Sequence, residues 1–118
     1  MTNPSATSSS KKCVPCEQGA AKLKFEQLLD LLKGLEGWAL TETDPPELVR
    51  SFKLKNDLQT LAFVSAIGWM AHTQDHHPDV RFGYNTCEVR YHTHSVGGIT
   101  ENDFICAVKV NELFAALG

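Results

Sequence analysis

Histidines are the side chains of this sequence whose placement most directly suggests chemistry. All five lie between positions 72 and 94, at His72, His76, His77, His92 and His94. An imidazole titrates near neutral pH, so it can give or take a proton under physiological conditions, and it is also a common metal ligand. The cluster therefore predicts either acid–base catalysis or a metal site.

The spacing of the histidines indicates how they could meet. His76 and His77 stand directly before Pro78, and a proline disfavours helical backbone in the residue before it, so the pair is expected at the end of a helix. His92 and His94 are two residues apart on an expected strand, so they face the same side. A helix end and a strand are therefore expected to bring imidazoles into one cleft.

The elements that must position these side chains follow from the periodicity of the apolar residues. Apolar residues recur with helical spacing in three segments, and alternation is typical of strands in four. The predicted helices run from about Ala20 to Gly34, from Asn56 or Asp57 to the residues before Pro78, and from Glu101 to about Leu117; the predicted strands are 38–42, 48–55 and two within 80–93 on either side of Asn85-Thr86.

The start of the third helix carries a local signal of its own. Thr100 followed by Asp103 resembles a capping box, in which the two side chains satisfy free N–H groups of the first turn. The order α-β-β-α-β-β-α predicts an α+β fold with two layers, a four-stranded antiparallel sheet with helices packed on one face. The free face or an edge strand could pair with another subunit.

The bulk properties fit one small domain. The chain has 118 residues and a formal net charge of −3, which does not favour direct nucleic-acid binding or an anionic membrane. Residues 1–18 include a Ser/Thr-rich start without the apolar core of a secretory signal, and we expect a disordered tail there and a single domain over 19–118. With no long apolar run to span a membrane, a cytoplasmic protein is expected.

Four cysteines are present, and two of them form a C-x-x-C motif, Cys13 and Cys16. In a cytosolic protein, cysteines are expected to be reduced thiols. A zinc or redox role for the motif would need a second ligand pair or a βαβ context, which the sequence does not offer. The favoured interpretation is a pair with no role in the folded domain.

Several of these motifs occur together in a known family. Asp75-His76-His77-Pro78, Tyr84-Asn85, Thr93-His94 and Asp103, with Gly37-Trp38 before them, resemble the pterin-4a-carbinolamine dehydratases, also called dimerization cofactors of a homeodomain transcription factor. The resemblance extends from about Leu28 to Leu117.

The resemblance implies a dehydratase, a hydro-lyase without cofactor or metal. Its substrate would be 4a-hydroxytetrahydrobiopterin, and loss of water would give the quinonoid dihydropterin, so that the tetrahydrobiopterin cofactor of aromatic amino acid hydroxylases is recycled. A dehydration needs one group that protonates the leaving hydroxyl and another that accepts a proton.

The resemblance also assigns roles to residues. His76, His77 and His94 would carry the chemistry and bind the pterin, and Asp75 and the Thr93 segment would line the site. Asp103 would orient His94, as a carboxylate orients an imidazole in other enzymes. His77 is expected to protonate the 4a-hydroxyl, and His76 or His94 to take the N5 proton. These assignments remain expectations of the resemblance.

The sequence departs from the family pattern at three places around the site. His72 stands where an acidic residue is usual, one helical turn from His76. His92 stands where a small hydroxyl residue is usual, and Val80-Arg81 replaces a Trp-Phe pair. These changes affect the expected pterin contacts more than the expected catalytic set.

Other functions stay open. A His-rich metal-binding protein could use His72, His76, His92 and His94 as four nitrogen ligands. A protein-binding module could lend a helix face to a transcription-factor partner, as relatives in this family do. A related role in pterin or molybdenum-cofactor metabolism is a third possibility. The resemblance also implies a homodimer or homotetramer.

Overall fold

The computed structural model describes residues 11–14 and 21–118, so most of the tail expected over 1–18, including Cys16, lies outside the described residues. The elements are α1 (Phe25–Leu32), β1 (Ala39–Leu40), β2 (Leu48–Lys53), α2 (Asp57–Gln74), β3 (Asp79–Phe82), β4 (Thr86–Tyr91), the short 3₁₀ turn η2 (His94–Val96) and α3 (Glu101–Ala116). The predicted α+β class and the order of helices and strands are confirmed. None of the described helices is long and apolar enough to cross a bilayer.

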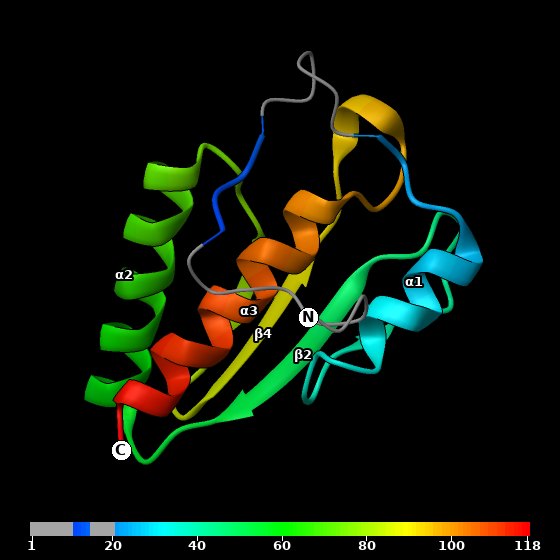
Figure 1. The fold of residues 1–118 in the computed structure, drawn as a ribbon. Helices are drawn as coiled ribbons and strands as arrows, with labels where there is room; N and C mark the ends of the chain where they lie inside the picture. Colours follow the sequence, from blue (N-terminus) through cyan, green and yellow to red (C-terminus); the bar gives the residue numbers. More distant parts are fainter. Residues whose placement is uncertain (1–10, 15–20) are drawn as a thin grey trace.

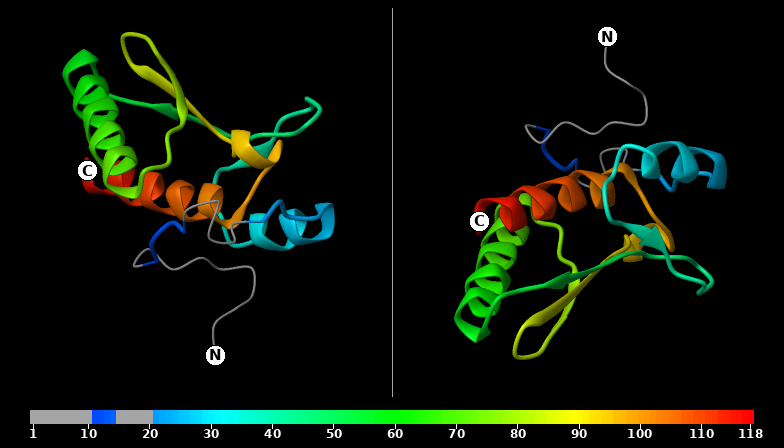
Figure 2. Two further views of the ribbon diagram at one scale, coloured as in Figure 1. Left: turned by 90° about the horizontal axis from the view of Figure 1, so that it is seen from above. Right: turned by 90° about the horizontal axis from the view of Figure 1, so that it is seen from below.

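The four strands form one antiparallel sheet in the order β1-β2-β4-β3. All three helices lie on one side of it, and the other side is open (Figures 1 and 2). The alternation along β4 follows from this arrangement, because Cys87, Val89 and Tyr91 are buried toward the helices whereas Glu88 and Arg90 face the open side. The sheet is thus covered on one face, as the sequence predicts.

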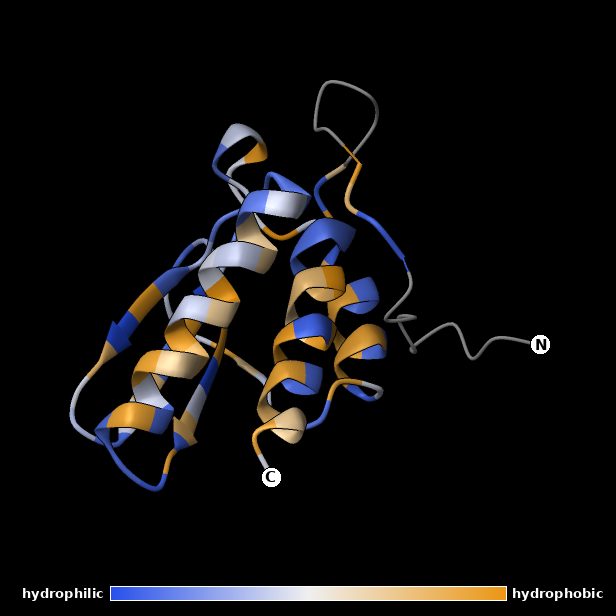
Figure 3. Cartoon of the chain, turned by 90° about the vertical axis from the view of Figure 1, so that its left-hand side faces the viewer, coloured by the Kyte–Doolittle hydropathy of each residue, from blue (hydrophilic) through white to orange (hydrophobic). Residues whose placement is uncertain are grey.

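The core lies between the sheet and α3. Phe52 of β2 packs against Phe63 of α2 and Phe114 of α3, with ring centroids 4.9 and 4.8 Å apart. Residues 102–107 of α3, including Phe104 and Ile105, are buried, whereas α2 carries exposed apolar residues on its outer side. Figure 3 views α2 from that outer side and shows few strongly hydrophilic residues along it.

Two helix ends determine where the site residues lie. Asn56 caps α2 by accepting a hydrogen bond from the Gln59 amide, and Asp75 ends the helix in left-handed backbone geometry, with φ 52°. The reversal at Asp75 directs His76 back toward α3. At the start of α3, the Thr100–Asp103 capping box is present as predicted.

Three element boundaries differ from the sequence prediction for tertiary reasons. The first helix begins at Phe25 rather than near Ala20, because Leu23 donates its amide to the Ile99 carbonyl at 2.8 Å. The first strand is shortened to Ala39–Leu40, and β2 ends at Lys53 because the Leu54 amide bonds to the Asn85 carbonyl in the adjoining turn.

Candidate functional site

The centre of the site is a buried carboxylate, Asp103, on the first turn of α3. Its side chain is fully buried, and His76 Nε2 lies 2.6 Å from Oδ1. The other oxygen, Oδ2, accepts hydrogen bonds from the Thr93 hydroxyl and from the Thr100 amide, each at 2.8 Å. One carboxylate therefore joins the end of α2, the segment after β4 and the start of α3.

His76 is held by packing as well as by this ion pair. Its amide bonds to the Ala71 carbonyl at 3.2 Å, and its ring stacks on Tyr91 with centroids 5.7 Å apart and planes 5° from parallel. The side chain is 11% exposed. Because Nε2 faces Asp103, the other ring nitrogen, Nδ1, is the one with which His76 can meet a ligand.

The surroundings of His76 also set its charge. Burial works against the imidazolium, but the hydrogen bond and the negative charge of Asp103 outweigh it, so the pKa of His76 is raised above its usual 6.5. Cys13 and Asp75 add smaller contributions in the same direction. His76 therefore holds a proton to higher pH than a free histidine, so the form that can act as an acid persists to higher pH.

The other two predicted catalytic histidines lie at the surface. His77 follows His76 and is exposed, and His94 opens the turn η2 directly after Thr93. His94 Nδ1 lies 3.2 Å from His92 Nε2, with the rings edge to face at 4.1 Å. Across 11–14 and 21–118, no hydrogen bond joins His76, His77 and His94 to one another; His76 is connected to the His94 segment through Asp103 and Thr93.

The predicted pairing of Asp103 with His94 is wrong. Sequence reasoning assigned the carboxylate to His94, whereas the structure pairs it with His76. The reason is geometric, because the capping box and Thr93 occupy Oδ2, and the remaining oxygen faces the end of α2. Of the other expected lining residues, Thr93 is buried within this network and Asp75 is exposed beside His76.

Two contributors to the site were missed by sequence reasoning. Tyr91 supplies the surface on which His76 stacks, and the strand alternation that places Cys87 and Val89 toward the helices could have placed it there. Cys13 is expected in the tail, yet its amide bonds to Gln74 at the end of α2, and its charge helps to raise the pKa of His76. No local pattern signals that contact.

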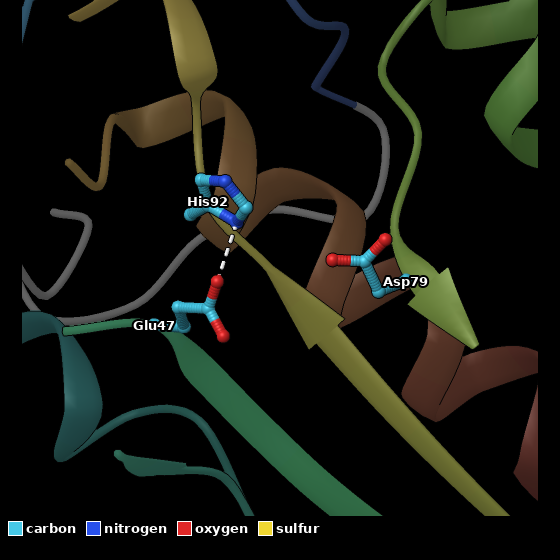
Figure 4. A group of neighbouring side chains, drawn as sticks. All are labelled: Glu47, Asp79 and His92. Atoms are coloured by element: carbon cyan, nitrogen blue, oxygen red, sulfur yellow. Dashed lines mark ion pairs between the residues drawn. The ribbon is translucent and has the colours of Figure 1, made fainter. Parts of the chain in front are cut away.

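A second polar group lies on the open side of the sheet. One carboxylate oxygen each of Glu47 and Asp79 and one ring nitrogen of His92 lie within 4.8 Å of one another, as potential metal ligands would. His92 Nδ1 is 2.8 Å from the Glu47 carboxylate (Figure 4). Arg90 also reaches Glu47 at 3.4 Å, so a positive side chain already pairs with that carboxylate. These contacts account for the position of the Glu47 carboxylate.

The four-histidine ligand set considered from the sequence is not assembled. His72 is exposed and packs against Trp69, with centroids 5.7 Å apart, whereas His76 bonds to Asp103 and His92 to Glu47. A hollow of about 520 Å³ opens at the opposite ends of the strands, and its walls contain no histidine.

Comparison with known proteins gives a consistent result. A family model described as pterin 4 alpha carbinolamine dehydratase matches residues 21–113. A protein of Nitrosomonas europaea is 51% identical over 105 residues, covering 88% of this chain and 90% of the relative. A protein of Legionella pneumophila (strain Corby) is 47% identical over 106 residues, covering 89% and 93%. Both are provisionally named pterin-4-alpha-carbinolamine dehydratase.

Solved structures are similar as well. A transcriptional coactivator/pterin dehydratase from Brucella melitensis has a TM-score of 0.75 and 32% identity, over 78% of this chain and 97% of that one. A pterin dehydratase-like protein identified as a RuBisCO assembly factor in the alpha-carboxysome has a TM-score of 0.57 and 24% identity, over 66% and 89%. The second likeness concerns the fold alone.

The His76–Asp103 pair makes a prediction for Asp103→Asn. Loss of the carboxylate charge leaves burial as the main influence, so the pKa of His76 is expected to fall in an NMR titration. The free energy of unfolding should fall by about 1.5–3 kcal/mol, the usual contribution of a hydrogen bond to a charged group. Asp79→Asn, on the exposed side of the sheet, is the control and should leave the pKa of His76 unchanged.

The pH dependence of that stability loss has a definite sign. The folded-state pKa of His76 is raised, so the stabilisation is fully present below the pKa of histidine in the unfolded chain. It is lost as pH rises through the folded-state pKa. Urea unfolding of the wild type and of Asp103→Asn across this pH range should show that the difference in their free energies of unfolding shrinks as pH rises. A difference that stays constant with pH would contradict the pairing.

Proposed function

Because the chain belongs to the pterin-4a-carbinolamine dehydratase family, we propose that it removes water from 4a-hydroxytetrahydrobiopterin to give the quinonoid dihydropterin. The reaction would return the tetrahydrobiopterin cofactor of aromatic amino acid hydroxylases to a recyclable form. The observation that supports this proposal best is the buried His76–Asp103 pair, which prepares one imidazole to hold a proton in a partly enclosed position.

The proposed reaction breaks the C4a–O bond and forms a C4a=N5 double bond. An acid gives a proton to the hydroxyl, which leaves as water, and a base takes the proton from N5, so protons balance without a cofactor. The raised pKa of His76 favours it as the acid, which changes the division of roles drawn from the sequence alone. His77 and His94, both exposed, then serve as candidates for binding the pterin and accepting the N5 proton.

Two further residues support this set in different ways. Thr93 is 3% exposed and donates its hydroxyl to Asp103, so we assign it a positioning role rather than direct contact with substrate. Asp75 is exposed next to His76 and contributes to raising its pKa, so it can line the pterin site as expected. The proposal includes no metal ion.

We also propose that the protein is a homodimer or homotetramer in the cytoplasm. Leu58, Leu61 and Trp69 on the outer side of α2 are 75%, 52% and 70% exposed, and large exposed apolar side chains favour contact with another protein surface. The alternative is that a transcription factor binds this side of α2, as the coactivator name of the Brucella melitensis protein suggests.

Oligomerisation can be tested by light scattering coupled to size exclusion. The wild type should elute with a mass of two or four chains, and Trp69→Ser should shift it toward the monomer. Phe25→Ser is a matched control, since Phe25 is 62% exposed but lies on α1. A single species of 13.0 kDa for the wild type would contradict the proposal.

The catalytic proposal predicts the effect of removing each histidine. Stopped-flow assays with enzymatically generated 4a-hydroxytetrahydropterin should show a rate loss of about 10²- to 10⁴-fold for His76→Ala, and losses for His77→Ala and His94→Ala. His72→Ala is the control, because His72 packs on Trp69 outside the site. Activity should survive a chelator.

Two results would overturn this proposal. One is a wild-type protein that gives no acceleration over buffer. The other is an activity that depends on His72 or His92 while His76→Ala leaves it intact, which would move the chemistry to the outer side of α2 or to the open side of the sheet, respectively.

A further inference from the structure

Residues 11–14 lie across the ends of two helices close to His76. The Cys13 amide donates to Gln74 Oε1 at the end of α2, at 2.9 Å. The Val14 amide donates to Asn102 Oδ1 at 2.9 Å, and the Asn102 side chain donates back to the Val14 carbonyl. These hydrogen bonds fix the backbone on either side of the Cys13 side chain and aim it at α3.

The side chain of Cys13 meets a second cysteine there. Its sulfur lies 3.4 Å from the sulfur of Cys106, which is fully buried on α3, and Cys13 itself is partly exposed. A disulfide needs the sulfurs at about 2.05 Å, so a modest side-chain movement separates this contact from a covalent bond. The two residues are 93 positions apart in sequence, so their contact depends on the folded structure.

The sulfur pair adjoins the candidate active site through Tyr91. The Tyr91 hydroxyl is buried without a hydrogen-bond partner among the described residues, and the two cysteines and Asp103 are the ionisable groups near it. The ring of Tyr91 also stacks with the ring of His76. A change at the sulfurs therefore acts on a residue that supports His76.

The two thiols are unequal in reactivity. The hydrogen bond from Cys106 lowers the pKa of Cys13 and outweighs the effect of burial. The pKa of Cys106 is raised, by its hydrogen bond to Cys13 and by burial. A partly exposed cysteine whose pKa is lowered, beside a buried thiol whose pKa is raised, is the arrangement of an attacking and a resolving cysteine.

From these contacts we propose that Cys13 and Cys106 form a peroxide-oxidisable dithiol site, whose intrachain disulfide fastens residues 11–14 to α3 beside His76. In the first step the Cys13 thiolate attacks hydrogen peroxide, and after proton uptake a sulfenic acid and water result. In the second, the Cys106 sulfur attacks that sulfenic sulfur, and its proton leaves with the hydroxyl as water. Each cycle oxidises two thiols and reduces one peroxide.

The test uses the full-length protein treated with hydrogen peroxide, followed by alkylation of free thiols and peptide mapping by mass spectrometry. The wild type should lose two thiols and two hydrogen atoms and yield a peptide pair linked through Cys13 and Cys106. Cys16→Ser is the matched control and should form the same link, whereas Cys13→Ser should not. Since Cys13 is partly exposed, its variant is expected to fold even if Cys106→Ser does not.

Three outcomes would overturn the site: a Cys13–Cys16 disulfide, a Cys13 sulfinic acid with Cys106 still free, or no oxidation at Cys13. The link to His76 has its own readout, because the negative charge of Cys13 raises the pKa of His76. Oxidation should lower that pKa in the wild type and in Cys16→Ser, but not in Cys13→Ser. An unchanged pKa in the disulfide form would overturn the coupling.

An effect of the disulfide on catalysis rests on the proposed dehydratase function, and the two can fail separately. If the linked peptides form but neither redox state dehydrates the pterin, the proposed function fails and the dithiol site stands. If the reduced protein is active and no disulfide forms, the reverse holds.

Discussion

The structure depends on the burial of one carboxylate, that of Asp103. A buried charge is costly unless it is paired and hydrogen-bonded, and here three donors and the N-terminal end of α3 surround it. The donors come from the end of α2, the segment after β4 and the start of α3, and the shared carboxylate holds these three segments together. The same hydrogen bonds that make the carboxylate tolerable in the core also fix the orientation of His76.

The two-layer arrangement explains why the site forms where it does. The helices cover one face of the sheet, so Tyr91 at the end of β4 is buried and offers its ring to His76. Directly beyond, the chain turns through Thr93 and His94 into α3, and the reversal at Asp75 returns the end of α2 to the same place. Catalysis, as proposed, uses a protonated imidazole inside this junction and two exposed imidazoles beside it.

Sequence reasoning predicted the fold because its signals are local. The alternation of β4, the cap at Asn56 and the Thr100–Asp103 box each act over a few residues, and each is present in the structure. The grouping of the histidines between positions 72 and 94 also indicated which side chains could carry acid–base chemistry. Local patterns were therefore sufficient to predict the helices and strands and to indicate acid–base chemistry at the histidines.

Long-range contacts account for what could not be predicted. Which histidine Asp103 would hold depends on how the end of α2 approaches α3, and the contact of Cys13 with Cys106 joins the beginning of the chain to its last helix. The late start of α1 has a similar origin, a hydrogen bond between Leu23 and Ile99. The spacing of residues along the sequence predicts none of these three contacts.

The most direct test of the central claim is the pH profile of the pterin dehydration rate in wild type and Asp103→Asn. If His76, charged through Asp103, is the acid, the limb that reports its titration should move to lower pH in the variant and follow the pKa of His76 measured by NMR. An identical profile in an active, folded Asp103→Asn protein would contradict the account, because the carboxylate would then not govern the catalytic proton.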